Sequence, residues 1–407
     1  MENSASAPRL LTLVLLTGLT VLSLNMFVPS LAHIAQALRA DYSLVSLAVS
    51  GYLGITAIVQ LIVGPLSDRF GRRPVLLAAL VVFIAGSVGC MLASSIWVFL
   101  TFRALQAAMI SGWVLALAVI RDTAPEQEAA SLMGYVSTAM AVAPMLGPVL
   151  GGALDELLGW RSNFVVLAGF GVAVLGLCWV DLGETNQSPS STFGAQLRSY
   201  PELLRSGRFW GYALCMTFST AAFYVFLAGA PLVATALGVS PAALGFCMGT
   251  ITAGFALGSF LSGRHARRYR LTTMMIAGRV AACTGLVAGL ALFLAGYLNA
   301  STLFGATVFA GFGNGLTNPS ANAGALSVRP TLAGSASGLS GALIVGGGAV
   351  LASITGALLT KQHGAYELLG MMLLCAALGL AAALAVRRID RRCSSGSEDR
   401  LPFVQSE

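Results

Sequence analysis

The chain has 407 residues, of which 57% are hydrophobic and only 10% are charged, and its mean hydropathy is +0.82. A soluble domain carries roughly 25% charged residues, so this composition excludes a soluble globular protein and indicates an integral membrane protein. The formal net charge is +7, which we interpret as a topology signal, and we expect no nucleic-acid partner. The seven cysteines show no C-x-x-C spacing, so we expect no metal site, no cofactor and no disulfide framework.

Twelve stretches of about 20 mainly apolar residues are long enough to cross a bilayer. They begin near residues 10, 44, 74, 97, 128, 162, 208, 241, 272, 299, 331 and 364. The first stretch runs too long for a signal peptide and lacks an A-x-A-like cleavage site, so it counts as a span. The sequence therefore predicts an all-α integral membrane protein with twelve transmembrane helices in two six-helix bundles.

The longest polar interval inside the chain lies between the sixth and seventh spans and divides the spans into six and six. We expect an N-terminal bundle over residues 1–182, a cytoplasmic linker over 183–207, a C-terminal bundle over 208–388 and a cytoplasmic tail over 389–407. The octapeptide LSDRFGRR at Leu66–Arg73 recurs as LSGRHARR at Leu261–Arg268, between two spans of the second half. Such an internal repeat indicates a duplicated half, which is typical of membrane transporters.

The basic residues assign the sides of the membrane. Three basic residues fall on the side opposite the N-terminus: Arg39, Arg161 and Lys361. Two others lie within spans, Arg103 and Arg279. All the other basic residues fall in segments on the same side as the N-terminus. Because positively charged loops stay in the cytoplasm, we expect a multi-pass protein with both termini cytoplasmic.

Four motifs resemble one transporter family. The stretch GPLSDRFGRRPVLL at Gly64–Leu77 resembles the loop 2–3 signature of the major facilitator superfamily. RALQ at Arg103–Gln106 and APMLGPVLGG at Ala143–Gly152 match its span-four motif and the antiporter signature of its twelve-span drug exporters. With NMFVPSLAHIA at Asn25–Ala35, the pattern is similar to the branch that includes bicyclomycin and chloramphenicol or florfenicol exporters. The resemblance implies a drug:proton antiporter of the bacterial inner membrane, and we expect a monomer.

The basic loop at Arg72 has two interpretations. The resemblance implies that Asp68 contacts the start of span eleven near residues 331–335 and that Arg72 reaches Asp122 at the end of span four. Such a cluster would latch the two halves in the outward-facing state. The simpler interpretation is that the arginines hold the loop in the cytoplasm by contacting anionic membrane lipids.

Span five carries small residues on one helical face. Gly147 and Gly151 are four residues apart, Gly152 follows, and Pro148 bends the helix. Small residues at this spacing allow another helix to approach closely. We predict that this packed face seals the inward end of the transport path.

The acidic residues all fall in loops, tails or span ends, whereas two arginines lie inside spans. A charge inside the membrane costs several kcal/mol unless it faces a cavity or a partner. The resemblance places Arg103 in the central cavity and associates it with proton coupling; snorkelling or pairing with carbonyls is the alternative, and for Arg279 we prefer that alternative. Because no carboxylate is available to compensate a cation, we expect neutral or anionic substrates.

The resemblance also places spans one, four, seven and ten around the substrate cavity. Asparagines recur in span ten at the i, i+4, i+8 spacing of one helix face, where they could line the cavity or join helices. Aromatic residues of spans two and seven could grip an apolar drug body or could be ordinary packing. The candidate cavity residues are Asn25, Tyr52, Arg103, Gln106, Phe223, Tyr224, Asn314, Asn318 and Asn322.

Proton coupling has no obvious carboxylate in the membrane. Members of the resembled branch carry an aspartate in span one where this chain has Asn25. The remaining titratable candidates are Asp68, Asp122 and His33, and His33 is alternatively an interfacial residue near the outer end of span one.

Together, these features predict a secondary active multidrug efflux transporter that exports small neutral or anionic antimicrobial-like compounds by alternating access, in exchange for protons. The alternative is a metabolite facilitator or uptake permease on the same fold that is not coupled to protons. An enzyme is not expected, because three scattered histidines and no membrane carboxylates leave no acid–base pair or metal site.

Overall fold

The computed structural model describes residues 9–124, 132, 136, 144, 146–186, 203–265, 268–328, 333–360 and 362–398. The regular elements in these ranges are all helices. The first half contains α1 (Leu10–Asn25), η1 (Val28–Ser30), α2 (Leu31–Ala37), α3 (Tyr42–Phe70), α4 (Arg72–Leu92), α5 (Ile96–Gln106), η2 (Ala107–Met109), α6 (Ile110–Thr123) and α8 (Arg161–Asp181). The second half contains α10 (Gly207–Ala236), α11 (Pro241–His265), α12 (Leu271–Leu294), α13 (Ala300–Ser327), α14 (Ala333–Leu358) and α15 (Gly364–Glu398).

The helices begin close to the predicted span starts. Within the described ranges, ten helical segments are long and apolar enough to cross a membrane. Two predicted spans are not among these ten. The fifth falls largely outside the described residues, although residues 146–158 are helical. The tenth, α13, is 28 residues long, but its asparagine, serine, threonine and glycine residues lower its hydropathy.

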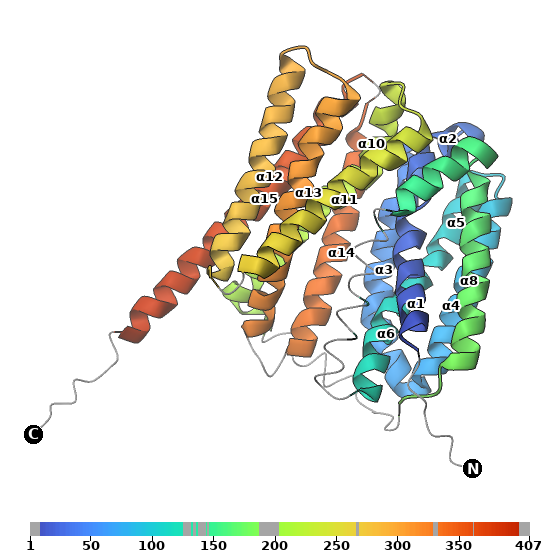
Figure 1. Cartoon of the computed structure of the whole chain (residues 1–407), viewed down its shortest axis with the longest axis horizontal. Coiled ribbons are helices and arrows are strands. Elements are labelled where there is room, and N and C mark those ends of the chain that lie inside the picture. Colours follow the sequence, from blue (N-terminus) through green and yellow to red (C-terminus); the bar gives the residue numbers. More distant parts are fainter. Residues whose placement is uncertain are drawn as a thin grey trace, which may run out of the picture.

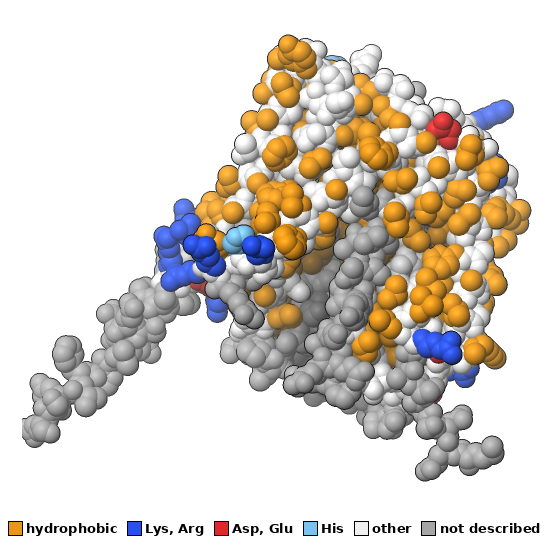
Figure 2. Space-filling view, viewed as in Figure 1, with side chains coloured by type: hydrophobic (Ala, Val, Ile, Leu, Met, Phe, Trp, Pro, Cys, Tyr) orange, Lys and Arg blue, Asp and Glu red, His pale blue; other side chains and the backbone are white. Residues whose placement is uncertain are grey.

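The helices stand side by side in two groups (Figure 1). Helices α1–α8 form the right-hand group in that view and α10–α15 the left-hand group, and α3 packs against α14 where the groups meet. The start of α1 and the end of α15 lie toward the same end of the molecule. Figure 2 shows most of its visible basic side chains toward this end, with hydrophobic side chains spread over the rest of the visible face. This separation of charge from apolar surface is typical of a membrane-spanning bundle.

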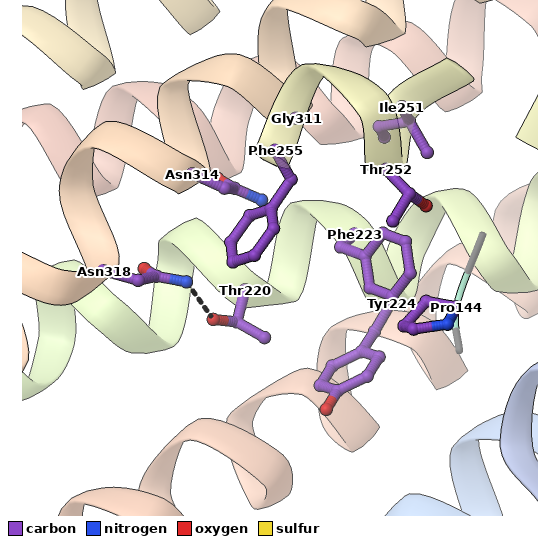
Figure 3. Close-up of a pocket in the computed structure, with 10 residues that line it drawn as sticks. All are labelled: Pro144, Thr220, Phe223, Tyr224, Ile251, Thr252, Phe255, Gly311, Asn314 and Asn318. Carbon is purple, nitrogen blue, oxygen red and sulfur yellow. Dashed lines mark hydrogen bonds between the residues drawn. The ribbon is translucent and has the colours of Figure 1, made fainter. Parts of the chain in front are cut away.

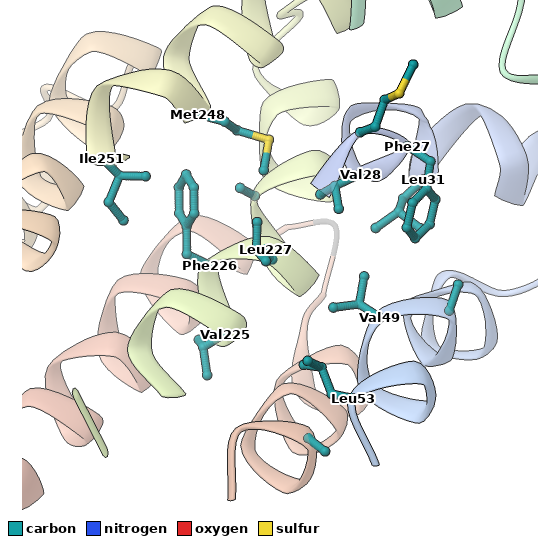
Figure 4. Packing of buried hydrophobic residues seen from close by; sticks show 14 of the residues in the cluster. Phe27, Val28, Leu31, Val49, Leu53, Val225, Phe226, Leu227, Met248 and Ile251 are labelled. Carbon is teal, nitrogen blue, oxygen red and sulfur yellow. The ribbon is translucent and has the colours of Figure 1, made fainter. Parts of the chain in front are cut away.

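The apolar core crosses the boundary between the groups. Figure 4 shows buried residues from η1 and α2, from α3, from α10 and from α11 in one continuous cluster: Phe27, Val28, Leu31, Val49, Leu53, Val225, Phe226, Leu227, Met248 and Ile251. Lipid tails are as apolar as these side chains, so association in a membrane depends on close packing rather than on excluding water.

Glycines bring three helices of the second group into backbone contact. A Cβ atom added to Gly311 of α13 would overlap the carbonyl oxygen of Ile251 on α11, and one added to Gly258 would overlap that of Phe312. On the other side of α13, Gly313 and Gly278 of α12 are related in the same way. The backbone of α13 is therefore held close to both α11 and α12.

We predict that Gly258→Ala destabilises the folded protein, because the added methyl group must displace the backbone of α13. Overpacking of this kind costs about 1–3 kcal/mol, which should lower the thermal midpoint of the detergent-solubilised protein by several degrees. Gly263→Ala is the matched control, since Gly263 lies on the same helix with no atom within 4 Å of the added Cβ. Equal midpoints for the two variants would contradict the prediction.

Candidate functional site

A cavity of about 210 Å³ lies within the second group of helices (Figure 3). Its walls come from α10, α11 and α13, with one residue from the helix that corresponds to the predicted fifth span. The lining residues are Pro144, Thr220, Phe223, Tyr224, Ile251, Thr252, Phe255, Gly311, Asn314 and Asn318. The walls are mostly apolar, and their polar groups are amides and hydroxyls. No acidic side chain is among the lining residues that the structure describes.

Asn314 is held in one orientation by its neighbours. Its Oδ1 atom accepts hydrogen bonds from Ser219 Oγ at 2.8 Å and from an Arg279 guanidinium nitrogen at 2.7 Å. A guanidinium group has donors and no acceptor, so the amide oxygen must face Arg279. The amide nitrogen, a donor, therefore points the other way, and Figure 3 shows it directed toward Phe255 across the cavity.

Arg279 itself is fully buried on α12. Its Nε atom donates to Thr317 Oγ1 at 3.0 Å, in addition to the bond with Asn314. No ion pair involves Arg279 among the described residues. Its partners are the Thr317 hydroxyl and the side-chain carbonyl oxygen of Asn314, so the guanidinium group pairs with a carbonyl inside the bundle and does not extend to a membrane surface. A positive charge thus lies one hydrogen bond away from the cavity wall.

The other asparagines of span ten differ in position. Asn318 lines the cavity, and its amide nitrogen donates to Thr220 Oγ1 at 3.3 Å. Asn322 is exposed and is not a lining residue. Phe223 and Tyr224 of α10 form one aromatic wall, with their ring centroids 6.0 Å apart. The structure therefore brings together four of the nine candidate cavity residues.

Arg103 lies in a separate cluster within the first group of helices. Its guanidinium carbon lies 4.2 Å from the Phe27 ring centroid and 4.0 Å from that of Tyr52. The side chain is 1% exposed, and it donates to the Ala48 carbonyl at 3.0 Å and to Gln106 Oε1 at 2.7 Å. These contacts combine cation–π stacking with hydrogen bonds to neutral groups.

Hydrogen bonds extend the Arg103 cluster to spans one and three. Gln106 Nε2 donates to Ser87 Oγ at 2.7 Å, and Tyr52 shares a hydrogen bond of 2.7 Å with Ser23. Asn25 lies apart, with its amide nitrogen bonded to the Val21 carbonyl and its Cβ beside Gly147. None of these candidate residues lines the cavity in the second group, and their part in transport stays a prediction.

The candidate latch residues meet at the end of the bundle where α4 begins. Arg72 forms an ion pair with Asp68, and its Nε atom lies 3.1 Å from Asp122 Oδ2. Its guanidinium group also donates to Ser67 Oγ at 2.5 Å. The predicted contact of Asp68 with span eleven cannot be traced, because residues 331–332 and the side chains of 333–335 lie outside the described part.

Glu184 joins this latch cluster and was not foreseen in the sequence. Its carboxylate oxygens accept hydrogen bonds from the backbone N–H groups of Arg72 at 2.9 Å and Arg73 at 3.2 Å. These N–H groups belong to the first turn of α4, which has no side-chain cap of its own. A carboxylate at a helix N-terminus is favoured by the helix dipole. The signal in the sequence was Gly71, which precedes α4 and has no side chain to cap it. An acid from another part of the chain therefore has to cap this helix.

The glycines of the antiporter signature make close backbone contacts. A Cβ atom on Gly151 would overlap the carbonyl oxygen of Met26, and one on Gly152 would overlap that of Pro241 at the start of α11. Reciprocally, a Cβ atom on Gly245 would overlap the carbonyl oxygen of Pro148. The contacts of Gly152 and Gly245 join the two groups at the end opposite the latch cluster, and that of Gly151 lies within the first group. On the predicted topology this is the outer end, so the seal does not lie at the inward end that the sequence predicted. Gly147 packs more loosely, against Leu22 and Asn25.

His33 on α2 has a buried acidic partner. Its Nδ1 atom lies 3.0 Å from Asp155 Oδ2, and the side chains are 44% and 1% exposed, respectively. Asp155 falls at the end of the fifth span, as expected for the acids of this chain, but its burial could not be seen from that position. Within the described residues, no group of three His, Cys, Asp or Glu side chains could hold a metal ion.

Comparison with known proteins gives a family model and several relatives. The model described as Major Facilitator Superfamily matches residues 13–353 and 213–403. YdgK, an uncharacterized MFS-type transporter of Bacillus subtilis (strain 168), is 32% identical over 299 residues, which cover 71% of this chain and 73% of that protein. Multidrug resistance protein D of Escherichia coli (strain K12) is 28% identical over 396 residues, covering 95% and 98%. A chloramphenicol resistance protein of Pseudomonas aeruginosa is 34% identical over 215 residues, covering 52% and 51%.

Solved structures share the fold at low sequence identity. The inward-facing, unoccupied structure of a bacterial homologue of the human lysosomal transporter Spinster has a TM-score of 0.74 at 17% identity, covering 93% of this chain and 96% of that chain. A D-xylose-proton symporter also has a TM-score of 0.74, at 16% identity, with the same coverage. The predicted fold class, twelve transmembrane helices in two six-helix bundles, is confirmed.

We predict that Asp68→Asn slows turnover at least about fivefold and leaves the affinity for the transported compound unchanged, because the ion pair with Arg72 acts on the state of the bundle and not on the cavity. Turnover is measured in membrane vesicles and affinity on the purified protein. Asp41→Asn is the matched control, since Asp41 carries the same charge just before the other end of α3. A loss of affinity without slowing would contradict the latch.

Proposed function

The chain belongs to the major facilitator superfamily, and we propose that it is a secondary active multidrug efflux transporter that exports small neutral or anionic antimicrobial-like compounds by alternating access in exchange for protons. Membership of this family makes the chain a transporter of small molecules and not an enzyme. The names of its relatives include multidrug, chloramphenicol and bicyclomycin resistance proteins, which supports drug export.

The substrate proposal rests on the orientation of the Asn314 side-chain amide. Its oxygen is occupied by Arg279 and Ser219, so only its N–H groups are offered to the cavity. A carbonyl, nitro or hydroxyl oxygen of a substrate can accept from this donor. A cation gains no carboxylate partner from the lining residues and is repelled by the buried guanidinium group.

The shape and composition of the cavity favour a small compound with an apolar body. Phe223, Tyr224 and Phe255 provide aromatic walls, and Ile251 adds an aliphatic one. Binding sites for small molecules typically combine such apolar walls with a few fixed polar groups. We propose that the aromatic walls hold the drug body while Asn314 and Asn318 select its polar groups.

We propose that the protein has the membrane topology predicted from its sequence. The protein is a multi-pass protein of the bacterial inner membrane, and its end rich in basic residues faces the cytoplasm together with both termini. The helices of residues 1–182 and 208–388 form the two moving halves, and 183–207 is the linker between them. Members of this family typically work as single chains, and we propose a monomer.

Alternating access is supported by the contact between the groups at one end of the bundle, where Gly152 and Gly245 hold them in backbone contact. At the other end Arg72 connects α4 with Asp68 of α3 and Asp122 of α6, all within the first group. We propose that the glycine contacts separate and the latch tightens when the transporter turns outward.

Proton coupling is proposed for the titratable candidates that lie outside the apolar core. Asp68 and Asp122 share Arg72, so protonation of either carboxylate would weaken the latch. His33 and the buried Asp155 form a second acid–base pair near the opposite end. The alternative, a metabolite facilitator or uptake permease, would need none of these groups to titrate.

Uptake into everted membrane vesicles tests the function. We expect accumulation of a neutral amphenicol that stops when the proton gradient is collapsed, and no accumulation of a lipophilic cation such as tetraphenylphosphonium. Vesicles without the transporter provide the background. Gradient-dependent uptake of the cation would overturn the charge argument, and uptake indifferent to the gradient would favour the facilitator.

We predict that Asn314→Asp lowers the affinity for a neutral amphenicol at least about tenfold, because the carboxylate removes the only donor that Asn314 offers and leaves an acceptor facing the substrate oxygen. Affinity is measured by equilibrium binding to the purified protein. Arg279→Gln should give a smaller loss, since the glutamine amide can still donate to Asn314 while the positive charge is gone.

Asn299→Asp is the matched control for this prediction. Asn299 caps the start of the same helix through a bond to the backbone of Thr302, and aspartate caps a helix equally well. The control should therefore keep both stability and affinity. An Asn314→Asp variant that binds the amphenicol like the wild-type protein would remove Asn314 from the site.

A further inference from the structure

A second cavity, of about 400 Å³ and lined largely by polar residues, lies at the end of the bundle where α10 and α12 begin. Four arginines line it: Arg208 near the start of α10, Arg270 before α12, and Arg387 and Arg391 on α15. Figure 2 shows basic side chains gathered at the corner where α12 begins and α15 projects from the bundle. The arginines of this cavity come from three separate chain segments and converge only in the fold.

The lining residues leave an excess of positive charge. Asp390 is the single acidic residue among the described lining residues, which include four arginines. Asp390 is already engaged, because its oxygens lie 2.7 Å from Arg208 Nε and 3.0 Å from the Tyr212 hydroxyl. Among the described lining residues, positive side chains therefore outnumber the one carboxylate, which is already bonded to Arg208.

The start of α12 adds donors to the same cavity. The 24-residue helix begins at Leu271, and no side chain caps its first N–H groups. The side chain of Thr272, which lines the cavity, is 7% exposed. Within the described ranges its hydroxyl has no hydrogen-bond partner. A helix N-terminus, the hydroxyl of a mostly buried threonine and planar guanidinium groups together match the oxygens of a phosphate group.

We propose that this cavity binds the phosphate group of an anionic phospholipid headgroup. The cavity lies where the apolar part of α15 ends, and Leu384, one to two turns before the two arginines on the same face of that helix, is 40% exposed, so an acyl chain can pack beside it. A soluble phosphate compound has the same chemistry and is the other source of the group. The site is independent of which drug the transporter exports.

Thermal unfolding of the purified full-length protein in a neutral detergent tests the site. We expect dioctanoyl phosphatidylglycerol to raise the midpoint by roughly 2 °C or more, and dioctanoyl phosphatidylcholine and inorganic phosphate to raise it less. The variant Arg270→Gln/Arg387→Gln should lose the shift. Arg264→Gln/Arg268→Gln is the matched control, because it removes the same charge from exposed residues in the same half that do not line the cavity.

The outcomes separate the explanations. An equal shift in the wild-type protein and the cavity variant, or an equal loss in the control, overturns the site and leaves a general surface charge. A shift by inorganic phosphate as large as that by the lipid, lost in the cavity variant, supports the phosphate site and overturns the lipid as its source. Should the double variant not fold, Arg270→Gln alone serves the same test, because this side chain is exposed.

Discussion

A guanidinium group inside a membrane-spanning bundle must be satisfied without a carboxylate, and this constraint organises both halves of the transporter. Arg103 and Arg279 are almost completely buried, and no ion pair satisfies either of them among the described residues. Leaving such a charge without partners in a medium of low polarity would cost several kcal/mol. Each arginine therefore donates hydrogen bonds to neutral acceptors, and these bonds fix the orientation of the acceptor groups.

The two arginines use this constraint differently. Arg103 is stacked between Phe27 and Tyr52 and is bonded to Gln106, so it ties the first four spans into one unit. Arg279 binds Asn314, whose other side borders the cavity of the second group, the proposed substrate site. The first half thus uses its buried charge for internal packing, and the second half uses it to orient a hydrogen-bond donor. The duplicated halves have become chemically unequal.

The same inequality holds at the ends of the bundle. The first copy of the repeated loop carries Asp68, which pairs with Arg72, and the second copy has Gly263 at the corresponding position. Arginines of the second half converge instead on a cavity at the beginning of α12. Backbone contacts at Gly152 and Gly245 join the halves at the other end, where only glycine allows the helices to come so close.

The sequence by itself determined the membrane class, the spans and the family, because hydropathy, positive loops and short motifs are local properties of the chain. It also predicted that Arg72 meets Asp122, since motif residues keep their partners in a shared fold. Only the tertiary structure decided that Asn314 and Asn318 line a cavity whereas Asn322, on the same stripe, is exposed. The partners of Arg103 and Arg279, the capping of α4 by Glu184 and the burial of Asp155 were decided there as well. Each of these depends on which helix packs against which face, and that packing joins residues that are far apart in the sequence.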